Sequence, residues 1–266
     1  MRIAVAGAAG RMGRRIVANI LESDNFELTG ALEYAGSPDL GKDAGLLAGC
    51  AACNVAITSD IEAALANADA VIDFATGGVM ECARVAAAKN VAMVIGTTAM
   101  TNEEKAELKK LTNNGFRLVM SGNMSVGVNL LFKITKEVAT ILGEDYDIEI
   151  VEMHHNQKKD APSGTAARLA EVVCEARDLS YEEDLRHGRE GMVGKRTKNE
   201  IGMHSLRGGD VVGDHTVIFA GTGERVELTH KASSRDVFVK GALRAALFLE
   251  NASAGLYDMQ DVLGLR

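Results

Sequence analysis

Residues 2–13 read Arg2-Ile-Ala-Val-Ala-Gly7-Ala-Ala-Gly10-Arg11-Met12-Gly13, a short apolar run that leads into three spaced glycines. A helical pattern of apolar residues then continues to Leu21. This order predicts a strand, a glycine turn and a helix, the arrangement that binds the pyrophosphate of a dinucleotide. Glycines let the backbone approach the phosphates, and the start of the helix offers its N–H groups to their charge.

The segment that follows supports the same interpretation. Residues 26–32 predict a second strand, and Glu33 stands at its end, where a carboxylate can bond a ribose hydroxyl. The spacing is Gly-x-x-Gly-x-x-Gly, because Ala9 holds the middle place of the commoner Gly-x-Gly-x-x-Gly. A glycine turn that only packs a helix on a strand is the alternative. The strand, the helix and the acid together favour cofactor binding.

Strands and helices continue to alternate up to residue 142. Further strands are predicted at residues 70–75, 91–95 and 117–120, and helices at residues 78–89, 102–112 and 126–142. Ligands bind beyond the carboxyl ends of the strands in open parallel sheets, so the loops 74–78, 96–98 and 121–124 are expected near a ligand. Small polar residues are also ordinary turn formers, so this expectation depends on position more than on chemistry.

The pattern changes in the second half of the chain. Strands are predicted at residues 146–153, 201–206, 210–220 and 225–230, with one inserted helix after Ser163, a long loop at 181–200 and a final helix at 236–251. The predicted fold class is α/β. A Rossmann-like dinucleotide-binding domain comprises residues 1–125 and 236–266. A second α+β domain, residues 126–235, is built on a mostly antiparallel or mixed sheet.

The composition argues against several classes of protein. The 266 residues are 47% hydrophobic and carry a formal net charge of −8. This balance indicates a core-forming protein and disfavours nucleic acid as a partner, because phosphate binding needs a basic surface. No apolar run approaches the roughly 18 residues of a membrane-spanning helix. The strand predicted from Arg2 leaves no room for a signal peptide, so a cytoplasmic protein is expected.

Two motifs contain metal-binding residue types, and neither predicts a metal site. Cys50 and Cys53 form a Cys-x-x-Cys, but a zinc site needs a second pair of ligands and none is visible. His154 and His155 lack a third ligand at the spacing of a His-Glu-x-x-His helix. No metal is therefore expected.

Residues 152–165 carry the strongest chemical pattern, Glu152-Met-His154-His155-Asn-Gln-Lys158-Lys159-Asp-Ala-Pro-Ser163-Gly164-Thr165. Ser163 is suited to cap the helix that follows, and the start of a helix attracts an anion. A histidine near lysines can transfer a proton near neutral pH. The stretch predicts a pocket for a small carboxylate whose reaction needs a proton. A solvated loop is the alternative, and neighbouring strand residues face opposite ways, so at most one histidine faces a pocket.

These motifs together resemble the dihydrodipicolinate reductase family over essentially the whole chain. The resemblance rests on residues 5–13, 94–98, 123–129, 152–155, 158–166, 189–191, 208–215 and 227–235. The His-His…Lys…Asp-Ala-Pro-Ser-Gly-Thr pattern is specific, whereas many dehydrogenases share the glycine motif. The resemblance implies hydride transfer from NADH or NADPH to 4-hydroxy-tetrahydrodipicolinate, a cyclic imine dicarboxylate. The implied products are tetrahydrodipicolinate and water, in lysine and diaminopimelate biosynthesis. It also implies a homotetramer assembled through the sheet of the second domain.

The resemblance further implies roles for residues at matching positions. His154 would be the proton donor and acceptor and Lys158 a proton donor; only the motif ranks Lys158 above Lys159. The implied substrate ligands are His155, Gly164 and Thr165. The implied cofactor ligands are Gly7, Ala8, Ala9, Gly10, Arg11, Met12, Glu33, Gly96, Thr97, Thr98, Ser121, Gly122, Asn123 and Met124.

One position departs from the family pattern. Members that favour the phosphorylated cofactor typically have an arginine after the acidic residue of the second strand, and here that place is Tyr34. Glu33 suits a free ribose hydroxyl, whereas a 2′-phosphate favours a guanidinium. NADH is therefore expected to serve at least as well as NADPH, with Arg11 as the residue that would still admit a 2′-phosphate. A reductase of another small carboxylate and a dinucleotide-sensing regulator are the alternatives, because a fold alone does not fix function.

Overall fold

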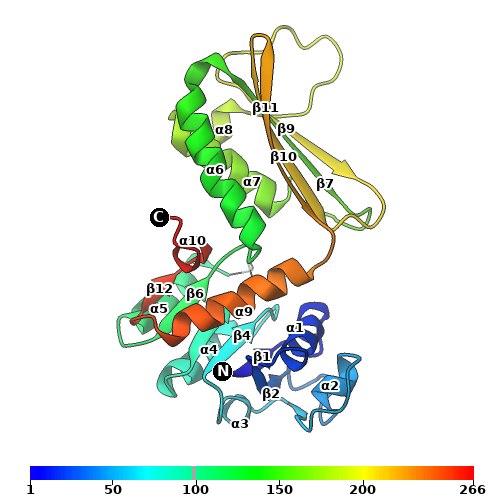
Figure 1. Cartoon of the computed structure of the whole chain (residues 1–266), viewed down its shortest axis with the longest axis vertical. Helices are drawn as coiled ribbons and strands as arrows, with labels where there is room; N and C mark the ends of the chain where they lie inside the picture. Colours follow the sequence, from blue (N-terminus) through cyan, green and yellow to red (C-terminus); the bar gives the residue numbers. More distant parts are fainter. Residues whose placement is uncertain (98–99) are drawn as a thin grey trace. The chain divides into compact units, whose positions relative to one another are not determined.

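The computed structural model describes residues 1–97 and 100–266, so Thr98 lies outside the described residues. The described chain divides into two units. The first consists of Met1–Val126 together with Asp236–Arg266, and the second of Gly127–Arg235. Both chain termini therefore belong to the first unit (Figure 1).

The first unit contains a seven-stranded sheet in the order β12-β6-β5-β4-β1-β2-β3, and its described strand pairs are all parallel. The strands are β1 (Arg2–Ala6), β2 (Glu27–Leu32), β3 (Ile57–Thr58), β4 (Ala70–Asp73), β5 (Ala92–Ile95), β6 (Arg117–Met120) and β12 (Gly255–Tyr257). β4 and β5 are buried throughout, as expected of central parallel strands with helices on both faces. The strand order reverses between β1 and β4, which is where such sheets bind ligands.

Helices cover both faces of this sheet. They are α1 (Arg11–Leu21), α2 (Ala44–Leu47), α3 (Ile61–Ala64), α4 (Val79–Ala88), α5 (Asn102–Thr112), α9 (Asp236–Glu250) and α10 (Met259–Val262). Ile16 of α1 and Val239 and Leu249 of α9 belong to the core on one face. Ala83 of α4 and Leu108 of α5 belong to the core on the other. Figure 1 shows α9 lying across the sheet, so the last long helix of the chain completes the first unit.

The second unit contains a five-stranded sheet in the order β11-β10-β7-β9-β8. Its elements are α6 (Val126–Leu142, whose first residue belongs to the first unit), η1 (Gly143–Asp145), β7 (Asp147–His154), α7 (Gly164–Arg177), α8 (Tyr181–Asp184), β8 (Leu185–His187), β9 (Ile201–Arg207), β10 (Gly213–Gly221) and β11 (Glu224–Ala232). β7 pairs antiparallel with β10 and parallel with β9. The predicted fold class, α/β with a mixed second sheet, is therefore confirmed.

One face of the second sheet packs against helices. Ile148, Ile150 and Glu152 alternate along β7 and are buried, whereas the residues between them are only partly buried. The two isoleucines share a core with Leu131 of α6 and Leu169 of α7. The period of two along β7 therefore sets which side chains face the helices and which face away.

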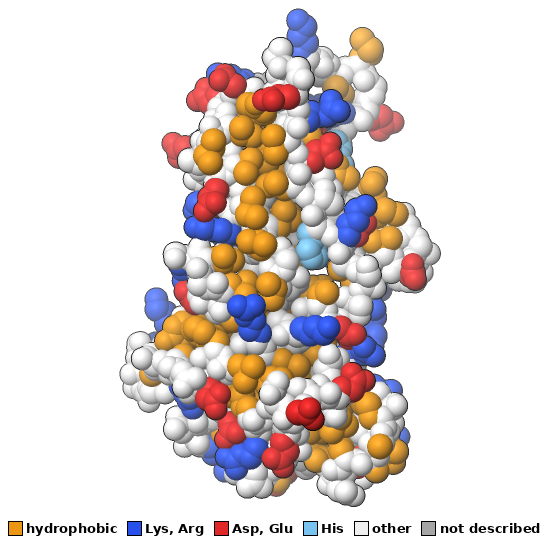
Figure 2. Space-filling view, in the orientation of Figure 1, with side chains coloured by type: hydrophobic (Ala, Val, Ile, Leu, Met, Phe, Trp, Pro, Cys, Tyr) orange, Lys and Arg blue, Asp and Glu red, His pale blue; other side chains and the backbone are white. Residues whose placement is uncertain are grey.

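Hydrophobic side chains are also visible on the outward side of α6 (Figure 2). Leu130 and Ile141 are exposed there. Charged residues interrupt the surface, and Lys133 pairs with Glu137 at a distance of 3.3 Å between charged atoms. No helix in the described parts of the chain is both long enough and apolar enough to cross a membrane.

Several short elements differ from the sequence-based expectation. Residues 181–200, expected to be a long loop, contain α8 and the edge strand β8. Ser180 caps α8 by accepting a hydrogen bond from the Glu183 N–H at 3.3 Å. β8 pairs in parallel with β9, Leu185 with Ile201, so its partner strand is not the segment that directly follows it in the chain. Helices of four residues and strands of two or three residues are too short to show a period, which is also why β3, α2, α3, β12 and α10 were not predicted.

Candidate functional site

A cleft of about 980 Å³ lies at the carboxyl ends of β1, β2 and β4 in the first unit. The glycine turn and the first residues of α1, α3 and α4 form its walls. Five of the predicted cofactor ligands line it, namely Gly7, Gly10, Arg11, Met12 and Glu33. Its position at the reversal of strand order and its glycine wall fit a dinucleotide.

The glycine turn has the geometry that brings backbone close to a ligand. Gly7 has a φ of +70°, which side chains rarely permit. A Cβ at Gly13 would lie 2.0 Å from the Gly7 carbonyl oxygen, so only glycine allows α1 to start this close to β1. Gly10 precedes α1 and has no side chain to occupy the N–H groups of its first turn. These groups are suited to hold a pyrophosphate.

Glu33 is held at the edge of the cleft by the glycine turn. Its Oε2 accepts a hydrogen bond from the Ala9 N–H at 3.0 Å, and its Oε1 accepts one from the Tyr34 N–H at 3.2 Å. Ala9 therefore positions the carboxylate and does not line the cleft. Ala8 is 2% exposed and packs into the core. Tyr34 is 66% exposed and lines the cleft beside Glu33.

The end of β4 contributes wall residues that the sequence located only as a loop. Asp73 lines the cleft although it is 1% exposed, and burial raises the pKa of its carboxyl to about 6. Its Oδ1 accepts a hydrogen bond from the Ala75 N–H at 2.8 Å. The neighbouring Phe74 ring fills the space beside Gly96, where a Cβ would meet the ring at 2.3 Å. A side chain at position 96 would therefore require the Phe74 ring to move.

The remaining predicted cofactor ligands follow β5 and β6, farther along the same edge of the sheet. Gly96, Thr97 and residues 121–124 are described but do not line the cleft. Ser121 donates from its Oγ to the Asn123 carbonyl at 2.9 Å, which shapes the loop after β6. Met124 is buried, and a Cβ at Gly241 of α9 would lie 1.7 Å from the Met124 carbonyl oxygen. The Met124 side chain therefore belongs to the core.

In the second unit, His154 is the last residue of β7 and is bonded to a buried carboxylate. Its Nδ1 lies 2.5 Å from Oε2 of Glu152, which is 0% exposed. Burial raises the pKa of Glu152, but hydrogen bonds from His154, Ser205 and Arg207 outweigh it and lower the pKa overall. Burial lowers the pKa of His154, against the opposing effect of Glu152. The pair therefore consists of a carboxyl group with a lowered pKa and an imidazole with a lowered pKa.

The first turn of α7 adjoins this pair. Ser163 caps the helix, since its Oγ accepts a hydrogen bond from the Ala166 N–H at 3.2 Å. The Ser163 N–H donates to Oε1 of Glu152 at 3.2 Å. Gly164 is exposed, and a Cβ built there would meet no atom within 4 Å. Thr165 is partly exposed. The helix start is therefore open to a small anion.

The loop between β7 and α7 places the other predicted residues. Lys158 bonds both carboxylate oxygens of Asp160, at 2.9 and 2.7 Å from its Nζ. After burial, which is the main cause, the charge of Lys158 also lowers the pKa of His154. His155 lies beyond the strand, and its N–H donates to the Val211 carbonyl at 2.8 Å. Among the described residues no cluster of three metal-ligating side chains occurs.

Two residues that the sequence did not single out complete the polar network. Arg207 Nη1 donates to Oε2 of Glu152 at 2.9 Å, and its Nη2 donates to the Asp160 carbonyl at 2.7 Å. His215 Nε2 lies 3.1 Å from the Ser163 Oγ, and the ring meets that of His154 edge-on at 5.2 Å. The register His154↔Arg207 brings Arg207 to the site, and only strand pairing reveals it.

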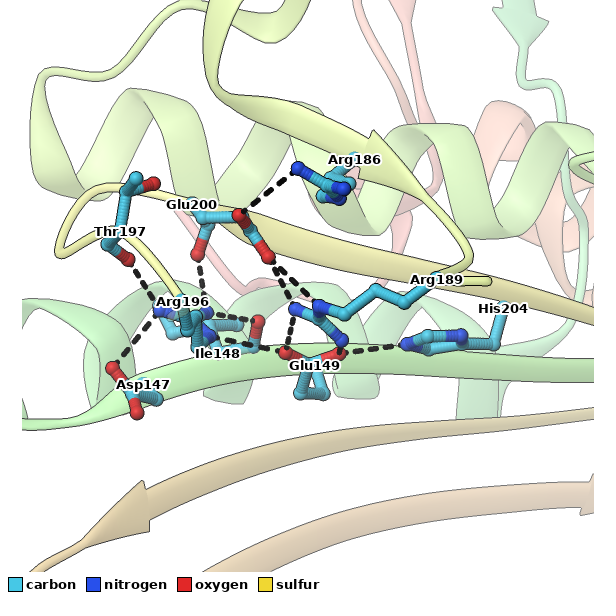
Figure 3. Close-up of polar contacts among 9 residues, drawn as sticks. All are labelled: Asp147, Ile148, Glu149, Arg186, Arg189, Arg196, Thr197, Glu200 and His204. Atoms are coloured by element: carbon cyan, nitrogen blue, oxygen red, sulfur yellow. Dashed lines mark hydrogen bonds and ion pairs between the residues drawn. The ribbon is translucent and has the colours of Figure 1, made fainter. Parts of the chain in front are cut away.

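A second charged cluster lies on the opposite face of β7, shown in Figure 3. Glu149 bonds both terminal nitrogens of Arg189, and its Oε2 lies 2.7 Å from His204 Nε2. Arg196 and Glu200 extend the cluster. Burial raises the pKa of Glu149, but hydrogen bonds from Arg189, His204 and Arg196 outweigh it and lower the pKa to about 2.

Comparison with known proteins matches both halves of the chain to one family. Family models described as dihydrodipicolinate reductase, N-terminus, and dihydrodipicolinate reductase, C-terminus, match residues 1–124 and 127–263. The chain is 52% identical to the 4-hydroxy-tetrahydrodipicolinate reductase of Geobacter metallireducens. It is 51% identical to that of Geotalea daltonii. Both alignments cover 100% of each chain.

Solved structures give the same result. A dipicolinate-bound dihydrodipicolinate reductase from a Paenisporosarcina species is 25% identical, with a TM-score of 0.76 over 98% of both chains. An amine dehydrogenase from Mycobacterium smegmatis, 14% identical, has a TM-score of 0.59 over 96% of this chain and 94% of its own, and shares the fold alone. On two matching family models and relatives of equal length, the chain belongs to the dihydrodipicolinate reductase family of oxidoreductases.

Proposed function

We propose that the protein reduces 4-hydroxy-tetrahydrodipicolinate with NADH or NADPH, giving tetrahydrodipicolinate and water in diaminopimelate and lysine biosynthesis. The family and the Rossmann-like fold support use of a nicotinamide cofactor. The observation that carries the proposal is the Glu152–His154 pair beside the open start of α7. It combines a proton-transfer group with a place for a carboxylate.

The first unit is proposed as the dinucleotide-binding domain, residues 1–125 and 236–266. Its first-turn N–H groups after Gly10 would face the pyrophosphate, and Glu33 would bond the ribose. The proposed ligands further along the edge are Gly96, Thr97, Thr98, Ser121, Gly122, Asn123 and Met124. The bound cofactor supplies a hydride to the ring of the substrate.

The second domain, residues 126–235, is proposed to hold the substrate. The N–H groups of Gly164 and Thr165 would bind one carboxylate, and His155 would contribute a further contact. Loss of the 4-hydroxyl as water gives an electron-poor conjugated ring, and hydride addition to that ring leaves an enamine that must take up a proton. His154 would deliver it, with Lys158 as a second donor; a positioned acid accelerates such a step by roughly two to four powers of ten.

The cofactor preference is proposed from the residues that surround the ribose. Glu33 presents a carboxylate. The exposed Tyr34 occupies the sequence position at which an arginine guanidinium would bind a 2′-phosphate. We expect NADH to be used at least as well as NADPH. Steady-state kinetics with both cofactors measure this, and a tenfold or larger advantage for NADPH in kcat/KM would contradict it. Tyr34→Arg should raise kcat/KM for NADPH, and Tyr34→Phe is the matched control.

The protein is also proposed to be a cytoplasmic homotetramer assembled through the second sheet. The face of that sheet turned away from α7 carries Leu206, which is exposed, and Val151, which is partly exposed. Burial of such residues against further copies would be favourable. Light scattering should give four times the chain mass of 28.2 kDa. A monomer at micromolar concentration would contradict the tetramer.

The direct test of function couples the protein to the preceding synthase, which makes the imine dicarboxylate. Oxidation of NADH or NADPH is followed by absorbance, and the product is identified by mass spectrometry. Turnover that depends on the synthase supports the proposal. Cofactor binding without turnover of this imine would favour a reductase of another small carboxylate.

A further inference from the structure

We propose that Glu152 is a positioning residue that fixes both the imidazole of His154 and the first turn of α7. The proposal rests on the proposed reaction for the role of His154 in proton transfer. Glu152 would not touch the substrate itself. It would set which ring nitrogen exchanges a proton and where the carboxylate-binding turn lies.

Three hydrogen-bonding partners of the Glu152 carboxylate, His154, Arg207 and Ser163, belong to the network around the proposed site. Glu152 is completely buried on β7. Its Oε2 bonds His154 Nδ1 at 2.5 Å and Arg207 Nη1 at 2.9 Å, and its Oε1 accepts from the Ser163 N–H at 3.2 Å. A buried charge is costly unless it is paired, and Arg207 supplies the pairing. The carboxylate is therefore held ionised between the imidazole and the helix.

The Glu152 carboxylate also determines the tautomer of His154. An ionised carboxylate accepts hydrogen bonds and cannot donate them, so His154 Nδ1 must carry a proton. In the neutral ring, Nε2 is then the nitrogen that takes up and releases a proton. Nε2 lies beside Gly213, where a Cβ would come within 3.1 Å of it. Glycine at this position leaves Nε2 uncrowded by a side chain.

Glu152 also affects how readily His154 holds a proton. Burial lowers the pKa of His154, and the charges of Lys158 and Arg207 lower it further. Glu152 is the group that acts in the opposite direction. Without it, the ring would lose much of its ability to hold a proton near neutral pH.

Contacts through Glu152, His215 and Ser163 link the imidazole of His154 to α7. The Ser163 N–H donates to the Glu152 carboxylate, which fixes the position of Ser163. The Ser163 Oγ in turn caps α7. The same Oγ contacts His215 Nε2, and the His215 ring lies edge-on to His154. Glu152, His154, His215 and Ser163 therefore form a closed ring of contacts. Loss of the carboxylate should disturb proton transfer and carboxylate binding together.

Glu149 provides a matched control three residues earlier on the same strand. It is a partly buried glutamate that also bonds a histidine and arginines, but it faces the other side of the sheet (Figure 3). Glu149→Gln and Glu152→Gln remove the same charge from comparable surroundings. Only Glu152→Gln should affect His154.

The decisive measurement is the NMR titration of ¹⁵N-labelled histidine in the full chain, without ligands. In the wild-type protein, neutral His154 should be protonated on Nδ1. In Glu152→Gln its pKa should fall by about one unit, and in Glu149→Gln it should stay unchanged. A wild-type His154 protonated on Nε2 when neutral would overturn the proposal, whether or not the variant folds.

Kinetics then test the consequence for the reaction. Glu152→Gln should lower kcat at least about tenfold, raise KM for the imine and leave the Kd for NADH unchanged. If protonated His154 donates, activity falls as pH rises through its pKa, so the descending limb should move to lower pH. Glu152→Asp keeps the charge, so its descending limb should lie closer to that of the wild-type protein than the limb of Glu152→Gln does.

The outcomes separate the two proposals. Absence of turnover by the wild-type protein would count against the proposed function, while the NMR titration would still decide whether Glu152 sets the His154 ring. Full turnover and an unmoved descending limb in Glu152→Gln would overturn the positioning role alone.

Discussion

Two histidines of the second unit have contrasting surroundings. His154 ends β7 beside an ionised carboxylate, which opposes the loss of basicity that burial causes. His215 lies on β10, almost fully buried, and burial lowers its pKa to about 4. His215 is therefore neutral near pH 7 and suits a hydrogen bond with Ser163, whereas His154 suits proton transfer.

His154→Gln should lower kcat by about two orders of magnitude or more, because it removes the proposed proton donor. The Kd for NADH, measured by fluorescence, should change little, since the proposed cofactor cleft belongs to the first unit. His204→Gln is the control, because His204 also bonds a glutamate but faces the other side of the sheet. Turnover near the wild-type rate in His154→Gln would remove His154 from the mechanism.

His215 should make the protein less stable in acid. Its pKa is about 4 in the folded protein and about 6.5 in the unfolded chain, so the unfolded chain binds more protons between these values. Stability should fall as pH drops from 6.5 to 4, by about 3 kcal/mol at most. The charges that act on His215 come from His154, Glu152, His230 and Lys158.

Chemical denaturation at about pH 7 and at about pH 4.5 measures this loss of stability, because these two pH values enclose most of the interval between the two pKa values of His215. His215→Gln should lose less stability than the wild-type protein between the two pH values. The difference between the two proteins is the useful quantity, because Asp73, with its raised pKa, acts in the opposite direction over part of the same range. An identical loss in both proteins would exclude His215 as the cause.

At the scale of elements, hydrophobic periodicity predicted the long helices and most of the strands. The remaining elements were not predicted because they are short. α5 and α6 begin and end at the residues expected from their patterns. The strand expected at 70–75 ends at Asp73, because the backbone there turns to bond the Asp73 side chain. Helices of four residues and strands of two or three residues gave no pattern. The Glu152–Arg207 contact was invisible because it depends on which strands pair.

Ser163→Ala should weaken the start of α7. Loss of the cap should cost about 1 kcal/mol and should raise KM for the imine, because the first turn is the proposed carboxylate site. Ser180→Ala removes an equivalent cap from the four-residue α8 and should leave KM unchanged. Thermal unfolding and steady-state kinetics measure the two effects. Equal KM values in both variants would argue against the α7 site.

At the scale of the whole molecule, the first unit is discontinuous in sequence. Residues 1–126 supply six of its strands, and residues 236–266 supply β12, α9 and α10. Val239, Ala246 and Leu249 of α9 pack in the same core as Ile3 and Val5 of β1. The sequence indicated a returning helix, but the seventh strand, with only three residues, could not be foreseen.

A chain that ends at residue 235 should therefore lack a complete first unit. The face of the sheet that α9 covers would be exposed to water, and apolar burial is the main stabilising contribution to folding. We expect rapid proteolysis within residues 1–126 of this chain and weak binding of NADH. A separately supplied peptide of residues 236–266 should restore part of the protection. Resistance equal to that of the full chain would contradict this expectation.

This layout has a consequence for synthesis on the ribosome. Translation makes the amino-terminal strands first, then everything from Gly127 to Arg235, and only afterwards the segment that closes the first core. The middle of the protein can thus reach its final form before the beginning does. Until the segment from Asp236 onward is made, nascent chains would carry an incomplete first unit with exposed apolar surface, which we expect to favour aggregation and chaperone binding.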